Sequence, residues 1–106
     1  MSDFSIREIW KVRYKRAISM IDYSGREMRI SDVGKHNSDY EPTLDHIRPL
    51  SQGGVDELDN LIICNRLTNF EKGESFSTWK TNGKRFQARR ERGKKNKYTI
   101  GGIEEL

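Results

Sequence analysis

The stretch TLDHIRPLSQGGVDELDNLIICNRLTNFEKG occupies residues 43–73 and determines the fold that we expect. Pro42 favours an extended chain over residues 43–47, where Leu44 and Ile47 bracket the polar pair Asp45-His46, and Pro49 and the Gly-Gly pair then force the chain to turn. The apolar run 61–64 indicates a second, buried strand. Asn65 is a suitable N-cap for a helix that ends at Gly73, which can take the left-handed conformation. The stretch therefore predicts the order strand, turn, strand, helix.

The segment before this stretch is expected to begin with an amphipathic helix. Ser5 and Glu8 have the spacing of a capping box, in which each side chain satisfies a backbone N–H at the helix start. Apolar residues then recur at three- and four-residue intervals, as they do along one face of a helix. We therefore predict a helix over about 5–21, followed by a short strand over 27–30 and a polar loop over 34–39.

The segment over about 76–97 is predicted to be helical and is strongly basic. Its aromatic residues provide apolar positions, although Asn82-Gly83 interrupts the pattern. Between Lys80 and Lys97 there are nine basic residues and one acid. The side chains expected to contact phosphate are Lys84, Arg85, Arg89, Arg90, Arg92, Lys94 and Lys95. The alternative is a solvated charged tail without function.

Composition limits the chain to one small domain, residues 1–106, with a single core. Hydrophobic residues make up 33% of the chain and charged residues 34%, so most of the surface must be charged. No run approaches the roughly 18 apolar residues of a membrane span, and the N-terminus lacks the pattern of a secretory signal. The single cysteine, Cys64, excludes an intrachain disulfide and suits reducing conditions. We therefore expect a cytoplasmic protein that does not bind membranes.

The pair Asp45-His46, the Gly-Gly turn, Asn60 and Asn69 stand in the same order and spacing as a known nuclease motif. Residues 43–73 resemble the ββα-metal core of the HNH endonucleases, also called the His-Me finger. The spacing is especially similar to that of the HNH domain of RNA-guided CRISPR nucleases, in which asparagine ends the motif. The resemblance implies an α+β fold, with a ββα-metal core flanked by the N-terminal amphipathic helix and the basic C-terminal helical segment.

Phosphodiester hydrolysis explains the types of residue in this motif. The reaction needs an activated water and a cation that neutralises charge on the phosphate and on the leaving oxygen. His46 is the candidate general base, because imidazole can accept a proton near neutral pH. Asp45 and Asn69 would give oxygen ligands to one Mg²⁺ or Mn²⁺ ion, with water and phosphate in the other positions. The resemblance assigns Asn60 a scaffold role, in which its amide ties the loop backbone together and holds the base in orientation.

DNA is the expected partner, held mainly through its phosphate backbone. Lys72 lies three residues after Asn69 and Arg66 three residues before it, so both share a helical face with that residue. Each cationic side chain could meet a phosphate oxygen there. The basic C-terminal segment would add affinity without sequence preference.

One feature departs from the pattern of the HNH endonucleases. Many HNH domains carry two Cys-x-x-Cys pairs that hold a structural zinc ion beside the active core. The corresponding positions here are Ile21, Ser24, Asn65 and Thr68, none of which is a strong zinc ligand, and Cys64 is displaced by one residue. We therefore expect no structural zinc. Packing of the two flanking segments would brace the ββα unit instead.

Three functions agree with these residues. A single metal site attacks one strand, so the leading hypothesis is a metal-dependent endonuclease that nicks DNA, which as a homodimer would make double-strand breaks. The first alternative is a nucleic-acid-binding or regulatory module that keeps the fold without catalysis, although retention of His46 favours the enzyme. The second is a nuclease subunit that is active only with partner proteins in a larger phage or defence assembly. Taken singly, each motif residue also has an ordinary explanation as a surface, turn or capping residue.

Overall fold

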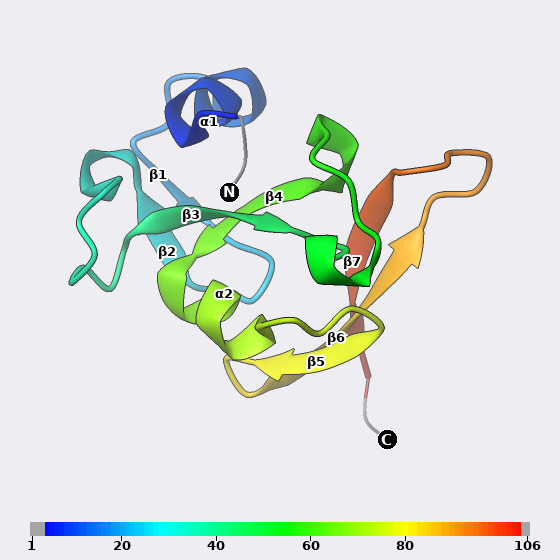
Figure 1. Cartoon of the computed structure of the whole chain (residues 1–106). Helices are drawn as coiled ribbons and strands as arrows, with labels where there is room; N and C mark the ends of the chain where they lie inside the picture. Colours follow the sequence, from blue (N-terminus) through cyan, green and yellow to red (C-terminus); the bar gives the residue numbers. More distant parts are fainter. Residues whose placement is uncertain (1–3, 105–106) are drawn as a thin grey trace.

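The computed structural model describes residues 4–104, which form an α+β fold with three antiparallel sheets (Figure 1). In chain order, the α-helices and strands are α1 Ile6–Tyr14, β1 Ser19–Ile21, β2 Glu27–Arg29, β3 Pro42–His46, β4 Leu61–Asn65, α2 Arg66–Lys72, β5 Thr78–Thr81, β6 Lys84–Arg90 and β7 Tyr98–Ile103. Three short 3-10 turns lie at Ile30–Asp32, Leu50–Gln52 and Leu58–Asn60. Strand β1 pairs with β2, β3 pairs with β4, and β5, β6 and β7 form one three-stranded sheet. None of the described helices combines the length and the apolar character needed to cross a membrane.

Strands β3 and β4 and helix α2 follow one another in the chain, with only two short 3-10 turns in the loop between the strands, which confirms the order predicted for residues 43–73. The two strands are antiparallel, and Asp45 lies opposite Ile62. The Asn65 side chain accepts a hydrogen bond from the Leu67 N–H at 2.9 Å, as an N-cap does. The local sequence signals therefore agree with the structure throughout this unit.

The apolar core lies between α1 and the β3–β4 hairpin. Its buried members are Ile9, Trp10, Met28, Leu61 and Ile63. Cys64 of β4 is also fully buried, and its Sγ lies 3.9 Å from Thr43 Oγ1 on β3. Burial raises the pKa of the Cys64 thiol, so this side chain stays protonated and is a poor metal ligand.

Helix α1 ends at Tyr14, earlier than the predicted limit near residue 21. Lys15 has a positive φ of 59°, and the chain leaves the helix there and returns as β1. The apolar pattern continues through Ile18 and Ile21, but these side chains are 79% and 66% exposed. Residues 19–21 therefore form a strand that pairs with β2, although their apolar spacing is that of a helix.

The prediction of a helical segment over 76–97 is wrong, because the chain forms the hairpin β5–β6 and the third strand β7. Asn82 and Gly83 both have positive φ, 51° and 74°, as a tight two-residue hairpin turn requires. Trp79 and Phe86 lie directly opposite each other across the hairpin and are both buried. The aromatic residues therefore follow the two-residue period of strands and not the helical period.

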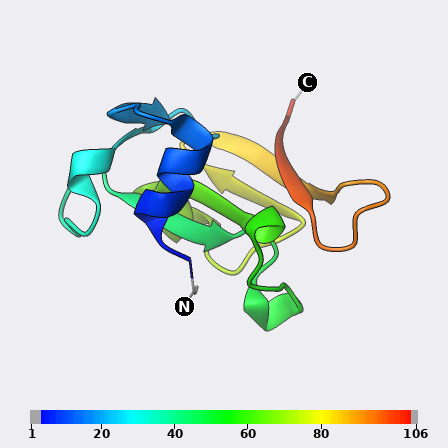
Figure 2. The same ribbon diagram turned by 90° about the horizontal axis from the view of Figure 1, so that it is seen from above.

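The three-stranded sheet packs beside α2, on the other side of the β3–β4 hairpin from α1 (Figure 1). Tyr23 joins the sheet to the centre of the molecule. Its hydroxyl accepts a hydrogen bond from Trp79 Nε1 at 3.0 Å, and its ring meets Phe86 edge-on at 5.0 Å between centroids. Figure 2 shows the loop between β6 and β7, in orange, extending away from the rest of the molecule.

A buried hydrogen-bond network joins positions to which the resemblance to HNH domains assigns structural zinc ligands. The Asp22 carboxylate is its centre: Oδ1 accepts from Ser24 N, Ser24 Oγ and Arg26 N, and Oδ2 accepts from Asn65 N at 2.9 Å. The hydroxyls of Ser24 and Thr68 lie 2.9 Å apart. Three of the four positions that correspond to zinc ligands are thereby joined through side-chain and backbone hydrogen bonds to one carboxylate.

The same network continues outward to the β5–β6 hairpin. Arg26 donates to Thr81 Oγ1 at 2.9 Å and pairs with Glu71 Oε1 at 2.7 Å. Glu71 also accepts a hydrogen bond from the backbone of Asn82, and this bond together with Arg26 lowers the pKa of the Glu71 carboxyl to about 2. Polar contacts therefore connect the turn before β2, helix α2 and the C-terminal sheet.

Candidate active site

Asp45 and His46 are the last two residues of β3 and line one open hollow. The other lining residues follow β3 and α2 in the sequence: Pro49, Leu50, Ser51, Gly73 and Glu74. Two of the residues predicted to be catalytic thus meet where the strand ends and the helix ends. An open hollow lined by acid and imidazole groups can admit water and a phosphate.

The Asp45 carboxylate is largely buried, with 13% of its side chain exposed. Its Oδ2 lies 3.3 Å from Lys72 Nζ as an ion pair, but it accepts no hydrogen bond from any described residue. Burial raises the pKa of the Asp45 carboxyl, and the Lys72 ammonium opposes part of that rise. The Lys72 ammonium is therefore the positive charge that accompanies this buried carboxylate oxygen.

The His46 imidazole is held by an acid from the loop that follows β3. Its Nε2 lies 2.8 Å from Asp56 Oδ1, and 15% of the His46 side chain is exposed against 22% for Asp56. The other histidine, His36, also contacts an acid, with Nδ1 2.8 Å from Glu41 Oε2, but its side chain is 84% exposed. Only His46 lines the hollow that contains Asp45.

The Asn60 side chain closes the loop between β3 and β4. This residue is fully buried. Its Oδ1 accepts from the Arg48 N–H at 2.8 Å, while its Nδ2 donates to the carbonyls of Arg48 at 3.0 Å and Val55 at 2.8 Å. The Asn60 carbonyl in turn accepts from the Ile47 N–H at 2.8 Å. One residue therefore fixes the beginning, the middle and the end of this loop.

Asn69 lies on α2 and is attached to β3 through its amide nitrogen. Nδ2 donates to Thr43 Oγ1 at 3.1 Å and to the Leu44 carbonyl at 3.3 Å. Within residues 4–104, no hydrogen bond engages its Oδ1. Asn69 is not among the residues that line the hollow of Asp45 and His46, so its part as a metal ligand stays a prediction.

Comparison with known families agrees with this geometry. A family model described as HNH endonuclease matches residues 22–78, more than half of the chain. The chain belongs to the HNH endonuclease family. No curated protein and no solved structure matches it. The matched range of this HNH endonuclease runs from Asp22 to the start of β5, so α1 and nearly all of the C-terminal sheet lie outside it.

HNH endonucleases usually use a divalent metal ion, and the residues of this one fit such an ion. The carboxylate of Asp45, which lines the hollow, and the amide oxygen of Asn69, which makes no hydrogen bond to residues 4–104, are both hard ligands of the kind that Mg²⁺ takes. No cluster of three or more acidic, histidine or cysteine side chains in the described part of the chain could hold a metal. An ion bound here would therefore depend on few protein ligands and would complete its coordination with water and substrate.

Lys72 of this HNH endonuclease does not offer its ammonium to a phosphate, contrary to the sequence-based expectation. Its side chain is 0% exposed. Nζ donates to the His46 carbonyl at 3.3 Å and lies 5.2 Å from the centroid of the Trp79 ring. Together with the Asp45 pair, these contacts make Lys72 an internal support of the end of β3.

The other cationic side chains lie away from the hollow. Arg66 Nε lies 3.8 Å from Glu41 Oε1, and the side chain reaches the loop before β3. The seven basic residues predicted to bind DNA are all exposed on β6 and on the loop after it. None of these eight residues lines the hollow. Their role in binding DNA stays a prediction.

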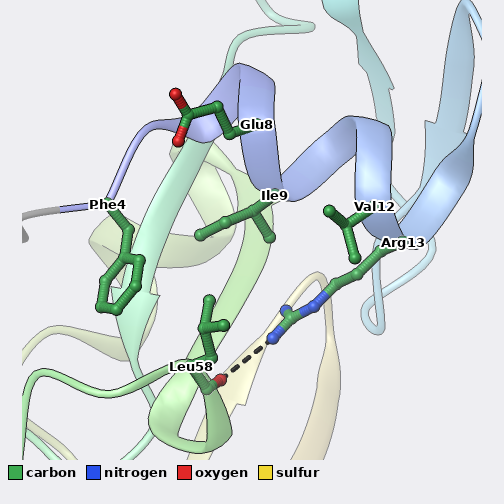
Figure 3. A pocket seen from close by; sticks show the side chains of 6 residues that line it. All are labelled: Phe4, Glu8, Ile9, Val12, Arg13 and Leu58. Atoms are coloured by element: carbon green, nitrogen blue, oxygen red, sulfur yellow. Dashed lines mark hydrogen bonds between the residues drawn. The ribbon is translucent and has the colours of Figure 1, made fainter.

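Helix α1 supports the far end of the β3–β4 loop in this HNH endonuclease (Figure 3). Arg13 donates to the carbonyls of Leu58 at 3.0 Å and Leu61 at 2.9 Å, on either side of Asn60. Phe4, Ile9 and Leu58 line a shallow apolar pocket beside this contact (Figure 3). A helix outside the family-matched range therefore holds a loop that belongs to the candidate site.

Two groups at the site were not predicted from the sequence. Asp56 stands ten residues after His46, where an acid in a polar loop has no distinguishing signal. Glu74 follows the end of α2, and its carboxylate accepts a hydrogen bond from Ser51 Oγ at 2.5 Å across the rim of the hollow. The contacts of Asp56 and Glu74 become apparent only in the folded chain, where the β3–β4 loop lies beside β3 and the end of α2.

Proposed function

We propose that this HNH endonuclease hydrolyses DNA one strand at a time, with His46 as general base and with Asp45 and Asn69 as ligands of a divalent ion such as Mg²⁺ or Mn²⁺. The observation that carries the proposal is the meeting of Asp45 and His46 in one open hollow at the end of β3. The loop closed by Asn60 supports the same assignment, because it fixes the backbone directly after His46.

Each of the site residues has a different role in the proposed reaction. His46 accepts a proton from the attacking water, which makes the water oxygen a better nucleophile toward phosphorus. Asp45 and Asn69 hold the ion through oxygen atoms, and Lys72 holds the Asp45 carboxylate in place. When bound, a divalent ion supplies positive charge that stabilises the phosphate oxygens and the leaving oxygen. With one such site, each encounter breaks one phosphodiester bond.

The test is cleavage of supercoiled plasmid DNA in Mg²⁺ or Mn²⁺ and in EDTA. We expect nicked circles before linear DNA, and no product in EDTA. His46→Ala should lower the rate by about 10²–10⁴-fold, because the positioned base is lost. The matched control is His36→Ala, which removes the exposed histidine and should cleave at the wild-type rate.

Three outcomes would contradict parts of this proposal. Undiminished cleavage by His46→Ala would refute the base assignment. Tight DNA binding without cleavage in either metal would favour a binding or regulatory module, or a subunit that needs partner proteins. Linear DNA as the first product would indicate paired sites, as in a homodimer, and would contradict cleavage of single strands.

A further inference from the structure

The carboxylate of Asp56 lies 2.8 Å from His46 Nε2. Both side chains are mostly shielded from solvent, at 15% exposed for His46 and 22% for Asp56. A hydrogen bond in such surroundings is stronger than one at an exposed surface. The pair therefore restricts the orientation of the imidazole more than a solvent-exposed contact would.

The chemistry of the two groups determines which ring nitrogen stays available. An ionised carboxylate can only accept a hydrogen bond, so Nε2 must carry the proton that it donates. In the neutral imidazole the other nitrogen, Nδ1, then has the free lone pair. We propose that Asp56 is a positioning residue, which holds His46 with Nδ1 ready to take the proton of the attacking water. This inference rests on the proposed function of His46 as the base.

The loop holds Asp56 in position on both sides. The carbonyl of Val55 accepts from Asn60 Nδ2 at 2.8 Å, and the carbonyl of Glu57 accepts from Asn60 N at 2.9 Å. A Cβ at Gly54 would lie 1.8 Å from the Arg48 carbonyl oxygen, so only glycine allows the close approach of the backbone there. The Gly-Gly turn and Asn60 thus direct one particular acid back onto His46.

His36 shows that a contact between histidine and an acid is not sufficient. Its Nδ1 lies 2.8 Å from Glu41, but the ring is 84% exposed and lies outside the hollow. The pair of His46 and Asp56 differs in its burial, in its place beside Asp45 and in its rigid loop. These three differences are the reason to assign a role in the reaction to Asp56.

The test compares Asp56→Ala with Asp59→Asn, a control at an exposed acid of the same loop. Plasmid nicking at saturating Mg²⁺ should fall about 10–10²-fold in kcat for Asp56→Ala with KM for DNA little changed, because a displaced base costs up to about 10²-fold. The control should keep the wild-type rate. In a His46→Ala background, Asp56→Ala should cause no additional loss, because its effect passes through the imidazole.

A readout without DNA separates this inference from the proposed function. The ¹H–¹⁵N resonances of the His46 ring report the hydrogen bond at Nε2, and Asp56→Ala should remove the protected Nε2–H signal while Asp59→Asn retains it. Unchanged ring resonances or unchanged kcat would overturn the inference. A higher Mg²⁺ requirement in Asp56→Ala would also overturn it, by making Asp56 a ligand. If the wild-type chain does not cut DNA, the proposed function fails, and loss of the ring signal would still show that Asp56 holds His46.

Discussion

Replacing Asp22 by asparagine tests whether the buried network takes the structural place that zinc has in many HNH domains. The carboxylate accepts four hydrogen bonds, three at Oδ1 and one at Oδ2. Asparagine has one side-chain oxygen, so its best orientation keeps the three bonds and turns its NH₂ group toward the Asn65 N–H. One bond to a charged acceptor is then lost and a buried donor is left without a partner.

The expected cost follows from that loss. A hydrogen bond to a charged group contributes about 1.5–3 kcal/mol, and the weaker neutral acceptor also reduces the other three, so we expect about 2–4 kcal/mol of destabilisation. With a urea dependence of about 2 kcal/mol per molar, the middle of the usual range, the unfolding midpoint should fall by roughly 1–2 M. Tryptophan fluorescence can follow the transition, because Trp10 and Trp79 are both buried.

Asp59→Asn is the matched control, because Asp59 is exposed and should change stability by less than about 0.5 kcal/mol. The reasoning would be refuted if Asp22→Asn unfolded at the same urea concentration as the control. Added Zn²⁺ should restore nothing in the variant. A rescue by Zn²⁺ would show that the region is a metal site and not a hydrogen-bonded substitute for one.

Four further predictions follow from the structure. Gly54→Ala should lower both the thermal midpoint and the nicking rate, because its Cβ would collide with a carbonyl, whereas Gly101→Ala, which has open space, should not. Asp45→Ala and Asn69→Ala should each raise the Mg²⁺ concentration needed for half-maximal cleavage; an unchanged requirement would refute the ligand assignment. Elemental analysis of the purified wild-type protein should find far less than one zinc per chain. Neutralising Arg89, Arg90 and Arg92 together should flatten the slope of log K for DNA binding against log salt by up to about two units. Arg89 and Arg90 are neighbours on β6 and face opposite ways, so at most two of the three arginines can meet the same duplex.

The central unit was predictable because its signals are local. The Gly-Gly turn, the Asn65 cap and the apolar run of β4 each specify their structure within a few residues. The C-terminal sheet was not predicted, although Asn82-Gly83 is a strong hairpin signal, because the aromatic and basic residues around it also suited a helix. The contact between Lys72 and the ring of Trp79 was therefore not predicted either, because Trp79 lies on strand β5 and not on a helix.

The sequence predicted which residues form the candidate site, and their roles stay predictions; it did not predict their contacts. The spacing of Asp45, His46, Asn60 and Asn69 is visible along the chain, and the family match covers all four. The partners of these side chains come from distant segments, and periodicity carries no information on them. Asp56 reaches His46 only because the loop is closed, and Arg13 supports that loop from a helix whose length the apolar pattern overestimated.

The buried thiol of Cys64 gives the wild-type chain an internal reporter. It is the single cysteine of the sequence, it lies at 0% exposure on β4, and its pKa is raised by burial. An alkylating reagent can therefore react with this protein only when the β3–β4 hairpin separates from its surroundings. The labelling rate, compared with that of an unfolded peptide, measures the free energy of local opening of β4, the strand that pairs with the one ending in His46, without any substitution or dye.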